Sequence, residues 1–197
     1  MKTYCALLFL VSFLSFPFFV QAAELQISSA PFLVGREQQF QVRVLLDPQR
    51  EELNALEGVI TFPSDILELK EVRTGNSIMG LWVEAPYIEQ PGRIVFSGVM
   101  PGGFAGVLSP HYEGAKPGEV FSLVFAAREE GAGKIDIQES RALLHDGEGT
   151  QAKLFTNSHA FVVQKEKVPN VAVIIPEDTV SPEPFEVNIE QDSSMFE

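Results

Sequence analysis

Three histidines and one carboxylate cluster are the residues of this sequence that could hold a metal ion. His111, His145 and His159 lack the separations of one or three residues that bring two imidazoles to one strand face or one helix turn. Asp146 and Glu148 could offer oxygens to a calcium ion, but their run lacks the further acidic positions and the distal glutamate of a calcium loop. We therefore predict no metal site and no cofactor, with calcium an option that the spacing does not support. We interpret residues 145–149, which contain both carboxylates, as a solvated hairpin turn.

The residue patterns of catalytic sites are missing from the sequence. It contains no Gly-x-Ser-x-Gly elbow and no phosphate-binding run of the Gly-x-x-x-x-Gly-Lys type. With 27 acidic residues, no pair of carboxylates can be singled out for glycoside hydrolysis. The only cysteine, Cys5, lies in the N-terminal apolar segment. The glycine-rich run 101–106 follows a predicted strand without opening a helix, so we expect it to be a loop. We predict no catalytic residue and no enzymatic activity.

Composition and charge favour a folded β protein that avoids nucleic acid. The 197 residues include 14 basic and 27 acidic ones, a formal net charge of −13, and such a charge repels a polyanion. Hydrophobic residues make up 45% and charged residues 21%, as in globular domains. The 13 prolines and 15 glycines interrupt the chain often, and no long 3.6-residue apolar period appears. Short strands and turns are therefore expected.

The N-terminus has the three parts of a secretory signal peptide. Lys2 supplies positive charge, residues 6–19 form an apolar run, and small residues follow at a processing site. We predict a signal peptide over 1–22, cleaved after Ala22, with Ala23 as the alternative. The apolar run is shorter than the roughly 20 residues of a membrane-spanning helix. We expect a secreted, extracellular or cell-surface protein without a permanent membrane span in the mature chain.

From residue 23 to 165 the sequence predicts a β-sandwich domain. Hydrophobic and polar residues alternate most clearly over 39–47, the period of a strand with one buried face. Turn residues such as Pro, Gly, Asn and Asp separate the remaining strands. The nine predicted strands are 25–28, 39–47, 54–62, 66–73, 81–87, 93–97, 120–127, 134–138 and 159–164. We therefore expect an all-β fold, a nine-stranded sandwich of two sheets.

Beyond this domain the composition changes. Residues 166–197 are rich in proline and acidic residues, which indicates a semi-rigid linker. Within it, 171–175 could instead form an edge strand. The alternation over 185–189 is consistent with the start of a truncated second domain.

Two predicted strands have an outer face of mixed character. In 54–62, the even positions from Leu56 onward are apolar or glycine, and the odd positions carry both apolar and polar side chains. In 93–97, the even positions are likewise apolar, and the odd positions are again a mixture of apolar and polar residues. Flat, half-apolar surfaces of this kind can dock a protein partner. The alternative is that valine and threonine here merely suit a pleated strand. The predicted partner-binding face consists of Glu57, Val59, Thr61, Arg93, Val95 and Ser97.

A second candidate surface is aromatic. Trp82 and Tyr87, with Tyr112, could form a platform on which a sugar ring stacks, as in carbohydrate-binding modules. The alternative is that Trp82, the only tryptophan, belongs to the core.

The order of these motifs resembles that of cohesin domains. Residues 54–69 resemble the third cohesin strand and its following turn, and 92–98, the glycines after it, and 118–125 match in order and spacing. The resemblance covers residues 24–164. It implies a nine-stranded jelly roll related to carbohydrate-binding modules, in a secreted protein that binds dockerin modules through a face including its third and sixth strands.

The third and sixth strands of the resemblance correspond to the two mixed faces found by parity, and its residue positions can be matched one by one. An acidic position of the third strand falls on Glu57, and an asparagine position falls on Ala55. Val99 and Met100 replace an acidic pair after the sixth strand. We therefore expect a non-catalytic cohesin-like module that attaches to an extracellular, dockerin-like protein, linked to polysaccharide degradation or cell-surface assembly. The alternatives are a carbohydrate-binding module with polysaccharide as its partner, and a structural module of a larger surface protein.

Overall fold

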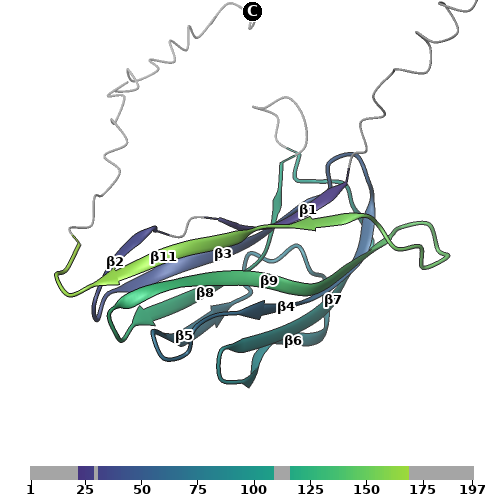
Figure 1. The fold of residues 1–197 in the computed structure, drawn as a ribbon. Coiled ribbons are helices and arrows are strands. Elements are labelled where there is room, and N and C mark those ends of the chain that lie inside the picture. Colours follow the sequence, from purple (N-terminus) through teal and green to yellow (C-terminus); the bar gives the residue numbers. More distant parts are fainter. Residues whose placement is uncertain (1–21, 29–30, 109–115, 169–197) are drawn as a thin grey trace, which may run out of the picture.

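The computed structural model describes residues 22–28, 31–108 and 116–168, which form strands, turns and loops without a helix (Figure 1). The strands are β1 (Ala23–Ser28), β2 (Leu33–Gly35), β3 (Gln39–Asp47), β4 (Leu53–Thr61), β5 (Leu67–Arg73), β6 (Leu81–Gln90), β7 (Arg93–Phe104), β8 (Gly118–Ala127), β9 (Gly131–Leu144), β10 (Leu154–Thr156) and β11 (Ser158–Gln164). They form a five-stranded sheet in the order β10-β1-β3-β8-β5 and a six-stranded sheet in the order β2-β11-β9-β4-β7-β6. The two sheets are the layers of the predicted all-β sandwich.

Each predicted strand overlaps an observed one, but the predicted count of nine is wrong. The described residues contain eleven strands, because β2 and β10 add three residues each at the sheet edges. Three residues are too few to display a hydrophobic alternation. β9 is also longer than predicted, since one end pairs with β11 and the other with β4.

The glycine-rich run 101–106 is a loop only in its last part, which corrects the expectation. β7 continues to Phe104, where it still pairs with Leu53 of β4. Gly102 and Gly103 have φ angles of 86° and 78°, which glycine adopts without strain. The strand therefore passes an irregularity in its pairing with β4 instead of ending there.

Aromatic contacts join the two sheets behind β4 and β7. Phe96 of β7 meets Phe121 of β8 edge-on, with ring centroids 4.9 Å apart. Phe62, next to the end of β4, meets Phe125 of β8 at the same centroid distance of 4.9 Å. All four rings are buried, so they contribute strongly to the hydrophobic stabilisation of the sandwich. The strands that carry the candidate face are therefore anchored on a packed core.

A tight turn of Pro91 and Gly92 joins β6 to β7. Gly92 has a φ of 78°, and a Cβ at this position would lie 2.5 Å from the carbonyl oxygen of Phe62. Proline followed by glycine suits the two central positions of a type II turn. The Phe62 N–H donates a hydrogen bond of 2.9 Å to the Gly92 carbonyl. This bond ties the β6–β7 hairpin to the end of β4.

Several predicted features lie outside the described residues. They are the signal peptide before Ala22, Tyr112, and the predicted linker beyond Val168. Within the described ranges, no helix is long and apolar enough to cross a membrane.

Candidate functional site

The outer face of β9, β4, β7 and β6 brings the six predicted partner-binding residues together. They form three cross-strand pairs between β4 and β7: Glu57 with Ser97, Val59 with Val95, and Thr61 with Arg93. The intervening residues Ile60 and Phe96 are buried in the core. Since side chains alternate along a strand, the paired residues point away from the core. We call this surface, on β9, β4, β7 and β6, the outer face.

One residue of the outer face is not accessible as expected. Val59 is only 6% exposed, which corrects the prediction that it can meet a partner. β4 lies between β7 and β9, and Arg93 of β7 reaches across it to Glu139 of β9. Two hydrogen bonds join these side chains, Nη2 to Oε2 at 2.9 Å and Nη1 to Oε1 at 3.2 Å. Val59 therefore contributes to the floor of the outer face rather than to its accessible surface.

Arg93 is held by carboxylates from two other strands. In addition to Glu139, it donates from Nε to Oε2 of Glu89 on β6, at 2.7 Å. Hydrogen bonds to Glu139 and then Glu89 raise the pKa of Arg93 above its ordinary value. The hydrogen bond from Arg93 lowers the pKa of Glu139. Arg93 is therefore a clamp that joins β6, β7 and β9, rather than a free cation.

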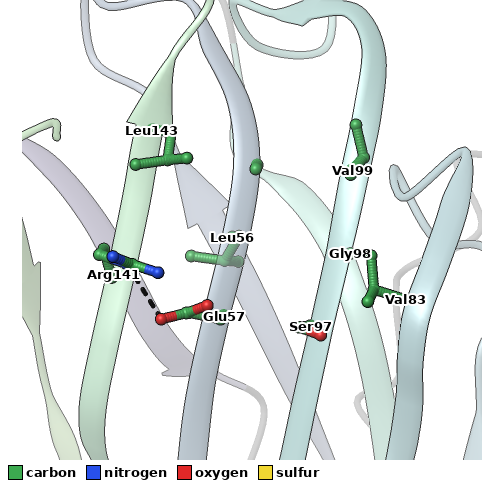
Figure 2. A pocket seen from close by; sticks show the side chains of 9 residues that line it. Leu56, Glu57, Val83, Ser97, Gly98, Val99, Arg141 and Leu143 are labelled. Carbon is green, nitrogen blue, oxygen red and sulfur yellow. Dashed lines mark ion pairs between the residues drawn. The ribbon is translucent and has the colours of Figure 1, made fainter. Parts of the chain in front are cut away.

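A second ion pair links β4 to β9. The Glu57 carboxylate lies 3.0 Å from Nε of Arg141, and both side chains are about half exposed (Figure 2). Surface pairs of this kind contribute about 0–1 kcal/mol to stability. Their main effect here is to hold two charged side chains in place on the outer face.

Beside this ion pair lies a shallow hollow, which the prediction from sequence did not include. It measures about 140 Å³, and Figure 2 shows its side chains. The residues that line it are Ala55, Leu56, Glu57, Val83, Ser97, Gly98, Val99, Arg141 and Leu143. Ala55 and Val99 were noted only as departures from the cohesin pattern, and β9 was predicted to end before Arg141. Only Glu57 and Ser97 belong to the predicted set.

Edge strand β6 carries exposed apolar side chains. Leu81 is 59% exposed, Val83 68%, and Tyr87 and Ile88 are each about half exposed. Trp82 instead lies on the inner side: it pairs with Gly98, packs against the core, and meets Phe121 edge-on at 6.3 Å between ring centroids. Tyr87 pairs with Val95 of the outer face. The predicted sugar platform is corrected accordingly, since its two described members point to opposite faces of β6.

The carboxylate run at 145–149 forms a turn. The Glu148 N–H donates to Oδ1 of Asp146 at 2.9 Å, and Gly147 and Gly149 have φ angles of 76° and 75°. Hydrogen bonding, first from Thr150, lowers the pKa of Asp146. Among the described residues, no group of three or more histidine, cysteine, aspartate or glutamate residues is placed to hold a metal ion.

The two-sheet sandwich is the fold of cohesin modules. A cohesin module from a family 33 glycoside hydrolase of Clostridium perfringens matches 75% of this chain and 100% of its own length, with a TM-score of 0.58 and 10% sequence identity. A non-cellulosomal cohesin from the archaeon Archaeoglobus fulgidus matches 74% of this chain and 93% of its own length, with a TM-score of 0.57 and 16% identity. The chain therefore has a cohesin-like fold, and the predicted resemblance is confirmed at the level of the fold.

Some of these similar structures contain a bound partner. A type I cohesin from Clostridium thermocellum, solved as a cohesin–dockerin complex, matches 74% of this chain and 95% of its own length at a TM-score of 0.57 and 10% identity. No protein-family model and no curated protein matches the sequence. The likeness is thus visible in the arrangement of the strands rather than in the residues.

Proposed function

We propose that this protein is a secreted, non-catalytic cohesin-like module that binds a dockerin-type protein through its outer face. The observation that carries the proposal is the pairing of Glu57 with Ser97 on adjacent strands of a cohesin-like fold, next to the partly exposed Val95. Parity selected these residues, and the resemblance implied a partner face on the same two strands. The solved cohesin–dockerin complex of similar fold supports the choice of partner.

The chemistry of the outer face suits docking. Its charged groups form ion pairs across strands, as between Arg93 and Glu139, and its apolar groups surround a shallow hollow. Partly apolar, flat surfaces with a polar surround are typical of protein interfaces. The proposal extends to export by the signal peptide 1–22, to a linker role for 166–197, and to a place in polysaccharide degradation or cell-surface assembly.

Titration calorimetry with a panel of purified, calcium-loaded dockerin modules tests this function on the chain from residue 23 onward. The test variant is Val95→Lys combined with Ser97→Lys, because both residues are partly exposed, whereas a lysine at Val59 would disturb a buried position. The matched control is Gln41→Lys, on the exposed face of β3 in the other sheet.

We expect at least one dockerin to bind, with affinity reduced about 100-fold by the double substitution and unchanged by the control. Far-ultraviolet circular dichroism checks that both variants are folded. Equal affinity of the double variant and the unaltered chain would show that the binding surface lies elsewhere. Retention by a polysaccharide gel, without any dockerin binding, would favour the carbohydrate-binding alternative.

A further inference from the structure

An apolar row crosses the outer face at the level of Ala55. In β-sheet register, Ala55 of β4 lies between Leu143 of β9 and Val99 of β7, and Val99 in turn pairs with Leu81 of β6. All four residues are at least partly exposed. Because the alanine side chain ends at Cβ, the row dips between two larger side chains. The hollow of about 140 Å³ lies at this dip.

The hollow has the size and lining of a socket for one side chain. Figure 2 shows Leu143 and Val99 projecting from the strands on either side, with Val83 on β6 beyond them. An engineered apolar cavity of roughly 150 Å³ accommodates a benzene ring. A leucine, methionine or phenylalanine side chain would therefore fill this space and would cover apolar atoms that are now in water.

The next row along the strands is charged, and in register it runs from Arg141 of β9 to Glu84 of β6. Glu57, Ser97 and Glu84 lie side by side, and with Glu139 they line a second hollow of about 230 Å³. Glu57 is paired with Arg141, and Glu139 with Arg93. Glu84 is exposed, and no ion pair joins it to another described residue. In a chain with a net charge of −13, this carboxylate attracts a cation from the partner.

We propose that the partner inserts one apolar side chain into the hollow over Ala55 and places a lysine or arginine next to Glu84, from positions two helical turns apart. The proposal rests on the proposed function and specifies its partner. Glu84 lies one outward row from Ala55, about 7 Å along the strands, and two strands away, about 10 Å across the sheet. The two sites are therefore about 12 Å apart, which is close to the rise of about 10.5 Å between helix positions i and i+7. One face of an amphipathic helix can thus fill both sites.

A phage library tests this pairing with a probe of defined geometry. A monomeric helical scaffold is randomised at two outward positions, i and i+7, and selected against the immobilised chain from residue 23 onward. Bound clones are then measured against Ala55→Asn and Glu84→Gln. The matched controls are Ala160→Asn, on the exposed face of β11 in the same sheet, and Glu130→Gln, in the turn after β8. Thermal unfolding verifies that every variant is folded, and Leu143→Ala, which widens the hollow, is measured as a second variant of the socket.

Enrichment of an apolar residue at one position and of lysine or arginine at the other supports the proposal. We expect Ala55→Asn to weaken these clones at least tenfold, Glu84→Gln to weaken them two- to fivefold in low salt, and both controls to leave them unchanged. Leu143→Ala should shift the selection toward larger apolar residues. Clones of other composition, or clones insensitive to Ala55→Asn and Glu84→Gln, overturn the proposal. If such clones no longer bind the Val95→Lys, Ser97→Lys variant, the outer face remains the binding surface and only the socket is wrong. If no clone depends on that face, both the socket and the proposed function are wrong.

Discussion

At the scale of single residues, Arg93 shows how a side chain expected to meet a partner organises the face instead. Its guanidinium binds Glu89 and Glu139, and both partners favour its charged form. The contact with Glu139 spans β4, which lies between β7 and β9. The arginine therefore fixes the shape of the outer face, and its substitution is expected to affect stability as well as any recognition by this face.

This role predicts a stability difference that depends on pH. The folded-state pKa of Glu139 is lowered by Arg93, so its stabilising contribution is present above the unfolded pKa of about 4.3 and is lost as the pH falls through the folded value. Urea unfolding should show Arg93→Gln to be less stable than the unaltered chain at pH 7, with the gap narrowing toward pH 3. Arg50 is exposed and has no ion pair among the described residues, so the stability difference between Arg50→Gln and the unaltered chain should not change between pH 7 and pH 3. A gap of constant size at both pH values would contradict the clamp.

Trp82 predicts a result that separates core packing from sugar binding. It is the only tryptophan and packs against Phe121. Trp82→Ala should lower the free energy of unfolding by about 2–3 kcal/mol. In the unaltered chain, tryptophan fluorescence should shift to longer wavelength on unfolding and stay constant when soluble polysaccharides are added. A polysaccharide-induced spectral change that reaches saturation would revive the sugar platform.

At the scale of elements, the two central strands were predictable and their neighbour β9 was not. From Ala55 to Thr61 of β4 and from Arg93 to Val99 of β7, uninterrupted alternation assigns each residue to a face, and the observed pairs follow it. In β9 the pairing with β4 shifts between Glu57 and Val59, next to Glu139 with its φ of 47°. Before this bulge Ile137 points inward, and after it Ala142 does, so the alternation changes parity. Because simple alternation would turn Leu143 inward, the hollow could not be found from the sequence.

The turn between β6 and β7 allows the contribution of one steric contact to be measured. Gly92 and Gly147 have nearly equal φ angles, 78° and 76°, but only at Gly92 would a Cβ meet a backbone atom, the Phe62 oxygen. Gly147→Ala should cost about 1 kcal/mol, the penalty of a left-handed backbone. Gly92→Ala should cost at least about 2 kcal/mol, because it adds the clash. Denaturant unfolding of both variants checks this, and equal costs would show that the hairpin moves freely away from β4.

At the scale of the whole molecule, the sandwich divides its tasks between its two sheets. The five-stranded sheet supplies Phe121 and Phe125 to the core, while the six-stranded sheet exposes the outer face and the apolar edge of β6. Composition and alternation were sufficient to predict this two-layer fold. The ion pairs across β4 were not predictable, because they depend on which strands become neighbours in the sheet.

The most direct test of the account is methyl chemical-shift mapping of the chain with a dockerin identified by calorimetry. If the outer face is the binding surface, the methyl signals of Ala55, Val95 and Val99 should shift on binding, while those of Leu45 and Val124 on the outer side of the other sheet stay in place. Shifts confined to Leu45 and Val124 would contradict the central claim.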